Sequence, residues 1–311
     1  MKLTDNAIDL IKKRYLRANE SSFSDIVSRV SKAIGKPSKK EKDYKHILES
    51  LDFLPNSPCL WNAGLSNYNK ACFVLDIPDS IKGIFDTLSL SAQIFKSGGG
   101  VGYFFGNLRE KNASLSDGGT SSGALSFLKI YNATTEEIKQ GGIRRGASMG
   151  VMPYDHPEIW DFIDLKLRTN SITNFNLSIL VDKKFMEAVE TNGIIHTYSR
   201  KNPKNIVSSY KAKELFSVIC YLAWRIGDPG IIFKDRVNED NIYYPKEEIV
   251  CSNPCGEQFL FSGESCCLGS INLSQCVTKS GNFNKKKFID LIRLQSFLQN
   301  SSIKNNLKEI G

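Results

Sequence analysis

The sequence contains no long hydrophobic run, and no stretch approaches the ~18 apolar residues that a membrane-spanning helix needs. Its first residues, Met1 to Asn6, lack the apolar core of a secretory signal, so we expect a cytoplasmic protein with no membrane partner. No internal repeat or long low-complexity stretch stands out. The composition is that of a soluble globular protein, with 41% hydrophobic, 24% charged and 10% aromatic residues. A length of 311 residues predicts one large domain or two small ones.

The formal net charge is +8. Such a charge suits an anionic partner, for example nucleotide phosphate or nucleic acid. Much of the excess comes from two lysine-rich runs that are typical of solvated surface, residues 36–45 and 285–287. Charge alone therefore does not identify a partner, and we expect no direct contact with nucleic acid.

The pattern along the chain predicts three regions. Residues 1–53 form an N-terminal helical region, because apolar residues recur there at helical spacing. Residues 54–297 alternate apolar strands with amphipathic helices, which predicts an α/β architecture with some parallel pairing. The expected strands are 71–77, 98–105, 147–152 and 174–181, and the expected helices are 80–96, 124–139, 157–167, 183–191 and 212–226. A last helix is expected over 283–299, and residues 298–311 are expected to be a divergent polar tail.

The cysteines are clustered. Four of the eight, at positions 251, 255, 266 and 267, fall within seventeen residues. Cys255 lies between Pro254 and Gly256, which predicts a turn that presents the thiol at its tip. Asn253 and Glu257 flank it at two residues on either side, and they offer an amide and a carboxylate for hydrogen bonding and acid/base chemistry. In a reducing compartment such a group is more often catalytic, metal-binding or buried than a structural disulfide.

Three other interpretations remain open at this point. The four cysteines could bind zinc, although adjacent Cys266 and Cys267 are a poor chelating pair. They could be buried apolar side chains, as we expect for Cys220 on an apolar helix face and consider for Cys267 and Cys276. Cys255 could be a protease-type nucleophile, but the chain offers only three histidines as base, and none has a motif-like setting.

The segment from Cys251 to Gln258, followed by Glu264-Ser265-Cys266-Cys267-Leu268-Gly269-Ser270-Ile271-Asn272-Leu273, resembles the signature of ribonucleotide reductases. The Pro-Cys-Gly sequence and the short separation of Cys255 and Cys266 along the chain resemble those of the adenosylcobalamin-dependent (class II) enzymes more than those of the diiron class. The resemblance implies that Cys255 carries a thiyl radical, which removes the 3′ hydrogen of the substrate ribose. It also implies that Asn253 and Glu257 bind and deprotonate the 3′ hydroxyl, and that Cys266 delivers electrons.

Other segments resemble the same family in the right order. Cys72, in a strand-like run, corresponds to the second electron-delivering cysteine, which would form a disulfide with Cys266. The segment from Phe53 to Gly64 is similar to one that contacts substrate, which implicates Ser57 and Cys59. The family usually has threonine where Cys59 stands.

The resemblance also implies a regulatory nucleotide site. Asp79 corresponds to the residue that binds the ribose of a nucleoside triphosphate effector, and Arg109 to the arginine that grips its phosphates. The loops 112–123 and 139–147 resemble the two specificity loops, so Lys139, Gln140 and Arg144 are candidate effector residues. The glycine run 98–102 alone is a weak signal, because it lacks the Lys-Ser/Thr ending of a P-loop.

The resemblance covers nearly all of residues 3–297. It implies the first half of a ten-stranded α/β barrel, which would reduce ribonucleoside di- or triphosphates with a thioredoxin-type reductant and dimerise through the effector-site helices. The expected partner is a separate C-terminal half, because the family's substrate-phosphate site and second half-barrel have no counterpart here. The alternative function is a non-catalytic fragment that binds effector nucleotide or a partner.

Overall fold

The computed structural model describes all residues except 1–2, 67–68, 117, 139–145, 170 and 307–311. The chain forms two compact units. The helical unit consists of residues 1–71, 97–99 and 266–311, and the sheet unit consists of residues 72–96 and 100–265. Among the described helices, none has the length and apolar character required to cross a bilayer.

The helical unit begins with α1 (Asp5–Arg14), α2 (Phe23–Ser38) and α3 (Glu41–Glu49). Thr4 caps the first helix, and Ser22 with Asp25 forms a capping box at the second, so local sequence fixes both starts. Strand β1 (Phe53–Pro55) and helix α4 (Ser57–Asn62) follow. Strand β1 pairs antiparallel with β12 (Gly269–Ile271), which precedes the 3-10 turn η2 (Leu273–Cys276).

Helix α12 (Lys285–Asn306) completes the helical unit. The helix predicted for 283–299 is therefore confirmed but is longer, and it continues through residues assigned to a polar tail. Leu291 and Leu298 are buried in the same apolar core as Ile26, Tyr44 and Phe53. Residues 299–306 contain a single apolar residue, Ile303, so hydrophobic periodicity did not predict this extension of the helix.

The sheet unit is built on a sheet with the strand order β11-β2-β3-β4-β5-β8. The five strands from β2 to β8 run parallel. The bounds of these five are β2 (Cys72–Asp76), β3 (Gly100–Phe104), β4 (Ser148–Pro153), β5 (Phe175–Val181) and β8 (Gly230–Phe233), and the sixth strand is β11 (Ser265–Cys266). Each of the four strands predicted from the sequence is present, within three residues of its expected bounds.

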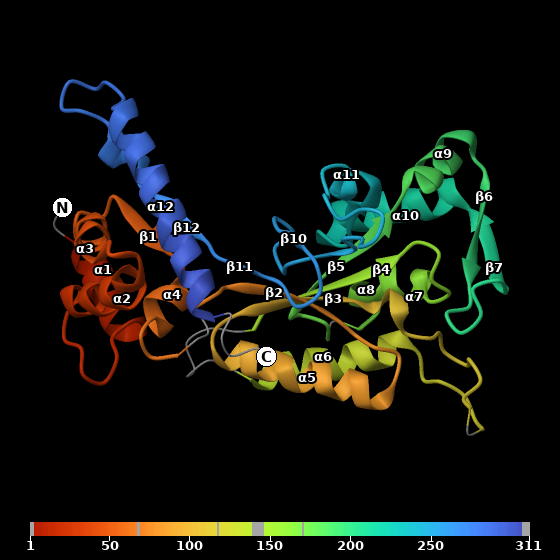
Figure 1. The fold of residues 1–311 in the computed structure, drawn as a ribbon. Helices are drawn as coiled ribbons and strands as arrows, with labels where there is room; N and C mark the ends of the chain where they lie inside the picture. The colour runs from red at the N-terminus through yellow and green to blue at the C-terminus, as the bar shows by residue number, and fades with distance from the viewer. Residues whose placement is uncertain (1–2, 67–68, 117, 139–145, 170, 307–311) are drawn as a thin grey trace. The chain divides into compact units, whose positions relative to one another are not determined.

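Helices α5 (Ile81–Lys96) and α6 (Ala124–Glu137) lie side by side along one face of this sheet (Figure 1). Because side chains alternate along a strand, one set of β-residues packs against these helices. That set includes Phe73, Val101, Tyr103 and Phe175, and Tyr103 makes an edge-to-face contact with Tyr131 of α6. The apolar core of the unit lies on this face.

Several smaller elements complete the sheet unit. They are η1 (Phe105–Asn107), α7 (Ile159–Ile163), α8 (Leu165–Thr169), α9 (Lys183–Thr191), β6 (Ile194–Tyr198), β7 (Ile206–Lys211), α10 (Ala212–Ile226), α11 (Lys234–Asn238), β9 (Cys251–Ser252) and β10 (Phe259–Leu260). The helix expected over 157–167 is two short helices. The antiparallel β6–β7 hairpin and strand β8 were not predicted.

Candidate active site

The second face of the sheet carries two glycines of β3 beside Cys72, Met149 and Asn176. Cys72 pairs in register with Gly100, and Gly102 pairs with Met149, which in turn pairs with Asn176. In parallel pairing these register partners project to the same side, opposite the apolar core. Gly100 and Gly102 therefore leave the β3 backbone uncovered by side chains on this face.

A short hairpin lies against this surface. Strands β9 and β10 pair antiparallel, and the segment that carries β10 lies across the sheet from α5 and α6 (Figure 1). A Cβ atom added to Gly102 would lie 1.8 Å from the carbonyl oxygen of Ser252, and one added to Gly100 would lie 2.7 Å from Cγ of Pro254. The backbone can approach this closely only because both positions are glycine.

Asn176 on β5 fixes the hairpin from the sheet side. Its Nδ2 donates to the carbonyl oxygen of Pro254 at 2.7 Å. The turn itself closes when the amide of Gly256 donates to the carbonyl of Asn253 at 3.0 Å, and Gly256 has φ +80°. Proline inside the turn and glycine at its end match the turn predicted from the sequence.

Asn253 is buried at the base of the turn. Its Oδ1 accepts from the amide of Gln258 at 3.0 Å and from the Ser252 hydroxyl at 3.2 Å. Its Nδ2 is buried and has no hydrogen-bond partner among the described residues. A buried amide donor without an acceptor is costly, so this atom marks a position where an acceptor from another molecule would be stabilised.

The two cysteines of the hairpin occupy opposite environments. Cys255 is exposed at the tip, and Glu257 is exposed beside it. Cys251 is buried in β9, and burial raises the pKa of its thiol strongly. A neutral buried thiol is a poor nucleophile and a poor metal ligand, so Cys255 is the accessible sulfur of this hairpin.

The predicted electron-delivering cysteines belong to different units, Cys72 to the sheet unit and Cys266 to the helical unit. Cys72 begins β2 and is buried, on the face that the hairpin covers. Cys266, also buried, ends β11, and its carbonyl accepts from the amide of Ala71, the residue before Cys72, at 3.4 Å. The backbone of the helical unit therefore holds Cys266 beside Ala71, the residue that precedes Cys72 in the chain.

Ser57 and Cys59 belong to the helical unit. Both lie in the first turn of α4, where Asn56 caps the helix by accepting from the amide of Cys59 at 2.9 Å. The Ser57 hydroxyl lies 2.8 Å from the hydroxyl of Tyr15. Cys59 is fully buried, and burial raises the pKa of its thiol strongly.

The predicted effector residues Asp79 and Arg109 contact each other. Nε of Arg109 lies 2.7 Å from Oδ2 of Asp79, and the amide of Arg109 donates to Oδ1 at 3.2 Å. Loop 112–123 folds back on itself through an isolated β-bridge between Ser114 and Thr120. Lys139, Gln140 and Arg144 lie outside the described residues.

The structure also tests the predicted burial of the other cysteines. The expectation that Cys220 is buried is wrong: it lies on the exposed side of α10, whose core side carries Leu215 and Ile219. Cys276 is buried, as considered.

Both ring nitrogens of His156 are engaged, one by the Leu108 carbonyl and one by the Glu158 amide, which removes it as a base for Cys255. Within the described ranges, no group of three or more His, Cys, Asp or Glu side chains is placed to hold a metal ion.

Sequence reasoning missed the residues that hold the hairpin. Asn176 and Gly102 contact it from the sheet, and Ser252 bonds Asn253 within it. Of these, only Gly102 belongs to a pattern that was visible in the sequence, the glycine run 98–102. The spacing of Gly100 and Gly102, two residues apart in a strand-like run, indicates close backbone approach on one face.

Comparisons with known proteins agree with this architecture. Residues 70–310 match the model of the ribonucleotide reductase barrel domain, and residues 1–68 match that of the ribonucleotide reductase all-alpha domain. A vitamin B12-dependent ribonucleoside-diphosphate reductase of Thermoplasma acidophilum is 44% identical over 81% of this chain and 32% of its own length. The enzyme of that name from Mycobacterium tuberculosis is 38% identical over 88% of this chain and 42% of its own length.

A more distant relative, the ribonucleoside-diphosphate reductase large subunit of Variola virus, is 29% identical over 80% of this chain and 36% of its own length. The chain thus spans about a third to two fifths of the length of these relatives. With five parallel strands on one side of the Cys255 hairpin and a helical region before them, the chain belongs to the ribonucleotide reductase large-chain family and carries the first half of its α/β barrel.

Proposed function

We propose that this chain reduces ribonucleotides to deoxyribonucleotides by a radical at Cys255. The observation that carries the proposal is the hairpin, which presents Cys255 at an exposed tip two residues after Asn253. The amide nitrogen of Asn253 is buried and has no hydrogen-bond partner among the described residues. An exposed sulfur beside a hydrogen-bond donor and the carboxylate of Glu257 suits a sugar with adjacent hydroxyl groups.

The reaction that these residues support removes and later returns one hydrogen atom. Cys255, as a thiyl radical, takes the 3′ hydrogen of the ribose, while Asn253 and Glu257 bind the 3′ hydroxyl and Glu257 accepts its proton. The 2′ hydroxyl leaves as water. Cys72 and Cys266 supply two electrons and two protons and become a disulfide: one proton leaves with the 2′ hydroxyl as water, and the other proton with the two electrons gives the new hydrogen at C2′. Glu257 then returns its proton to the 3′ oxygen, and Cys255 returns the hydrogen atom to C3′.

The disulfide must be reduced before the next turnover. We assign this step to a thioredoxin-type dithiol, which exchanges with the Cys72–Cys266 disulfide and leaves as a disulfide itself. The backbone hydrogen bond between Ala71 and Cys266 supports this pairing, because it brings the two chain segments into register beside each other.

Relatives named vitamin B12-dependent support adenosylcobalamin as the radical source. The cofactor, when bound, supplies a carbon-centred radical that can oxidise a thiol. The part of this chain that fits its reactive side is the tip at Cys255 and Gly256, since a Cβ added to Gly256 would meet no atom of the described chain within 4 Å. A bulky cofactor needs such an uncovered sulfur.

The ion pair of Asp79 and Arg109 supports a nucleoside triphosphate effector site. A guanidinium held by one carboxylate keeps further donors for phosphate oxygens. We assign Lys139, Gln140 and Arg144 to the same site. A homodimer through α5 and α6 is supported by exposed apolar side chains on these helices, which include Ile81, Phe85 and Ile130.

Activity requires the rest of a reductase chain, because the relatives are more than twice as long as the region matched. The test is turnover of a ribonucleoside di- or triphosphate by this chain together with the remaining reductase segment. Cys255→Ser should abolish turnover, Cys72→Ser or Cys266→Ser should allow at most one turnover, and the exposed Cys220→Ser should change nothing. Multiple turnover by Cys255→Ser would end the proposal. Effector binding with no turnover would instead favour a non-catalytic nucleotide-binding role.

A further inference from the structure

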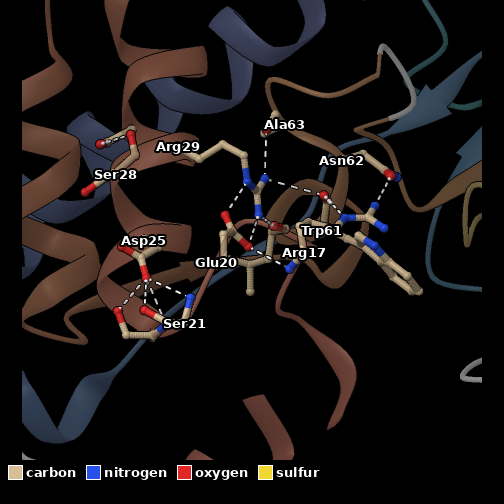
Figure 2. Close-up of polar contacts among 12 residues, drawn as sticks. Arg17, Glu20, Ser21, Asp25, Ser28, Arg29, Trp61, Asn62 and Ala63 are labelled. Atoms are coloured by element: carbon tan, nitrogen blue, oxygen red, sulfur yellow. Dashed lines mark hydrogen bonds and ion pairs between the residues drawn. The ribbon is translucent and has the colours of Figure 1, made fainter. Parts of the chain in front are cut away.

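Helix α4 is held at both ends by side chains from the first thirty residues. At its start, the hydroxyl of Tyr15 lies 2.8 Å from that of Ser57. At its end, Arg29 donates to the carbonyls of Leu60 at 3.0 Å and Ala63 at 2.8 Å, and more weakly to that of Trp61 at 3.4 Å (Figure 2). A helix of six residues has no internal partners for its last carbonyls, and the guanidinium supplies them.

Glu20 joins Arg29 to a second arginine. Nε of Arg29 lies 2.6 Å from Oε1 of Glu20, and the amide of Arg17 donates to Oε2 at 3.0 Å. The side chain of Arg17 donates to the carbonyl of Trp61 at 3.2 Å and to Oδ1 of Asn62 at 3.2 Å (Figure 2). Its guanidinium also lies 4.4 Å from the centre of the Trp61 ring, a cation–π contact.

This network is largely buried, because the Glu20 and Arg29 side chains are only 8% and 14% exposed. Apolar packing would hold a short helix as firmly, and a buried ion pair carries a desolvation cost that often cancels its attraction. Directional bonds to four successive groups at the end of α4 instead fix the orientation of the helix. Asn62 extends the network, since its Nδ2 donates to the carbonyl of Ser97 at 2.9 Å.

We propose that Tyr15, Arg17, Glu20 and Arg29 form a positioning network that sets α4, so that Ser57 meets the substrate nucleotide in one orientation. The inference rests on the proposed substrate contact of Ser57. Tyr15 orients the Ser57 hydroxyl directly, and the two arginines with Glu20 prevent the helix from rotating or fraying at its other end. None of the four touches the reacting atoms.

The first test needs no ligand. Cys59 is fully buried within α4, so its alkylation by iodoacetamide, followed by peptide mass spectrometry, reports opening of this helix. Glu20→Gln should accelerate Cys59 alkylation about tenfold, since it removes the carboxylate charge that pairs with the largely buried guanidinium of Arg29. Glu49→Gln makes the same change in an exposed pair with Lys45 and should have no effect. Alkylation of exposed Cys220 should match in all variants. An unchanged Cys59 rate in Glu20→Gln overturns the network.

The second test concerns the nucleotide, with CDP and CTP as probes in the assembled reductase. Tyr15→Phe keeps the ring and should weaken nucleotide affinity about three- to tenfold. Tyr44→Phe is the matched control, because the Tyr44 hydroxyl is buried in the same unit without a hydrogen-bond partner among described residues. Combined with Ser57→Ala, Tyr15→Phe should add nothing further, a coupling that a merely structural role would not produce.

The outcomes separate the two claims. Wild-type affinity in Tyr15→Phe, with turnover still dependent on Cys255, overturns the positioning role and leaves the proposed function standing. If Ser57→Ala leaves nucleotide affinity unchanged, Ser57 does not contact the nucleotide, and the positioning role of the network is refuted with it. Absence of any ribonucleotide reduction by the assembled wild type contradicts the proposed function itself.

Discussion

Position within one hairpin decides which thiol can react. Cys251 and Cys255 are four residues apart, yet the first is enclosed beside Gly102 and the second stands at the exposed tip. Burial raises the pKa of Cys251 and keeps it as a neutral thiol. The separation of roles therefore depends on how closely the hairpin backbone lies on the sheet.

Gly102→Ala tests that close approach. The new Cβ would lie 1.8 Å from the Ser252 carbonyl oxygen, so the hairpin must move away from β3. We expect a loss of about 1–3 kcal/mol in the free energy of unfolding, and a much larger loss of turnover. Gly150→Ala is the control, because its nearest contacts are side-chain atoms at 3.3 Å or more on the other face. Chemical denaturation measures the first effect; equal activity in both variants would refute the account.

His156 predicts a pH dependence of stability. Burial lowers the pKa of His156 to about 4, whereas an unfolded histidine titrates near 6.5. Between these values the unfolded chain binds a proton that the folded chain does not, so stability should fall as the pH falls through this window. His156→Gln should reduce that slope in urea unfolding between pH 7 and pH 5, and the exposed His46→Gln should leave it as in the wild type. An identical slope in His156→Gln would show that another group is responsible.

The sequence predicts the turn around Cys255 better than the contacts that hold this turn on the sheet. Pro254, Gly256 and the polar neighbours of Cys255 are adjacent in the chain, and their turn is confirmed. Asn176 lies 78 residues from the carbonyl that it holds, and only the packing of the hairpin on the sheet brings them together. Hydrophobic periodicity contains no information on such tertiary packing, which is why this contact could not be predicted.

At the scale of elements, a buried carboxylate replaces a missing cap. Helix α6 begins after Gly123, which has no side chain to cap it. Glu158 supplies the acceptor: its Oε2 accepts from the amides of Ala124 at 2.8 Å and Lys111 at 3.2 Å. One carboxylate thus holds both ends of loop 112–123, the first predicted specificity loop.

Glu158→Ala should free both amides. We expect a loss of about 1–2 kcal/mol of stability and faster hydrogen exchange at Lys111 and Ala124. The exposed Glu187→Ala, which breaks only an i,i+4 pair with Lys183, should change neither. Hydrogen exchange measured by NMR or mass spectrometry tests this role of Glu158. Unchanged protection of the Ala124 amide in Glu158→Ala would disprove the cap.

Elements with a strong apolar period were predicted, and those without one were not. Strands β2 to β5 and helices α5, α6, α9 and α10 carry core residues at regular spacing. Strand β7 is exposed along nearly all its length, including Ile206 and Val207, so no alternation marks it. The sequence predicted one continuous helix over 157–167, because hydrophobic periodicity does not reveal the break at Asp164 between α7 and α8.

At the scale of the whole chain, the helical unit joins distant parts of the sequence. Leu291 and Leu298 of α12 share a core with α2 and α3, and Lys287 pairs with buried Asp52 at 2.6 Å. The first fifty residues therefore do not form their core alone. This long-range packing is invisible to sequence periodicity, which treats each helix separately.

Leu291→Ala should destabilise the helical unit. The side chain is 5% exposed, and its truncation should cost about 2–4 kcal/mol and increase cleavage within residues 23–49 by a dilute protease. Ile292→Ala, at an exposed neighbouring position of 42%, should cost little. Equal protease resistance of the two variants would mean that α12 does not stabilise the N-terminal helices.

The central claim is that Cys255 removes the 3′ hydrogen of a ribonucleotide. Its most direct test is competition between 3′-protio and 3′-deuterio nucleotide in the assembled reductase, followed by mass spectrometry of the remaining substrate. The account predicts faster consumption of the protio form and no consumption of either form with Cys255→Ser. Continued reduction by Cys255→Ser, or equal consumption of both isotopologues by the wild type, would contradict it.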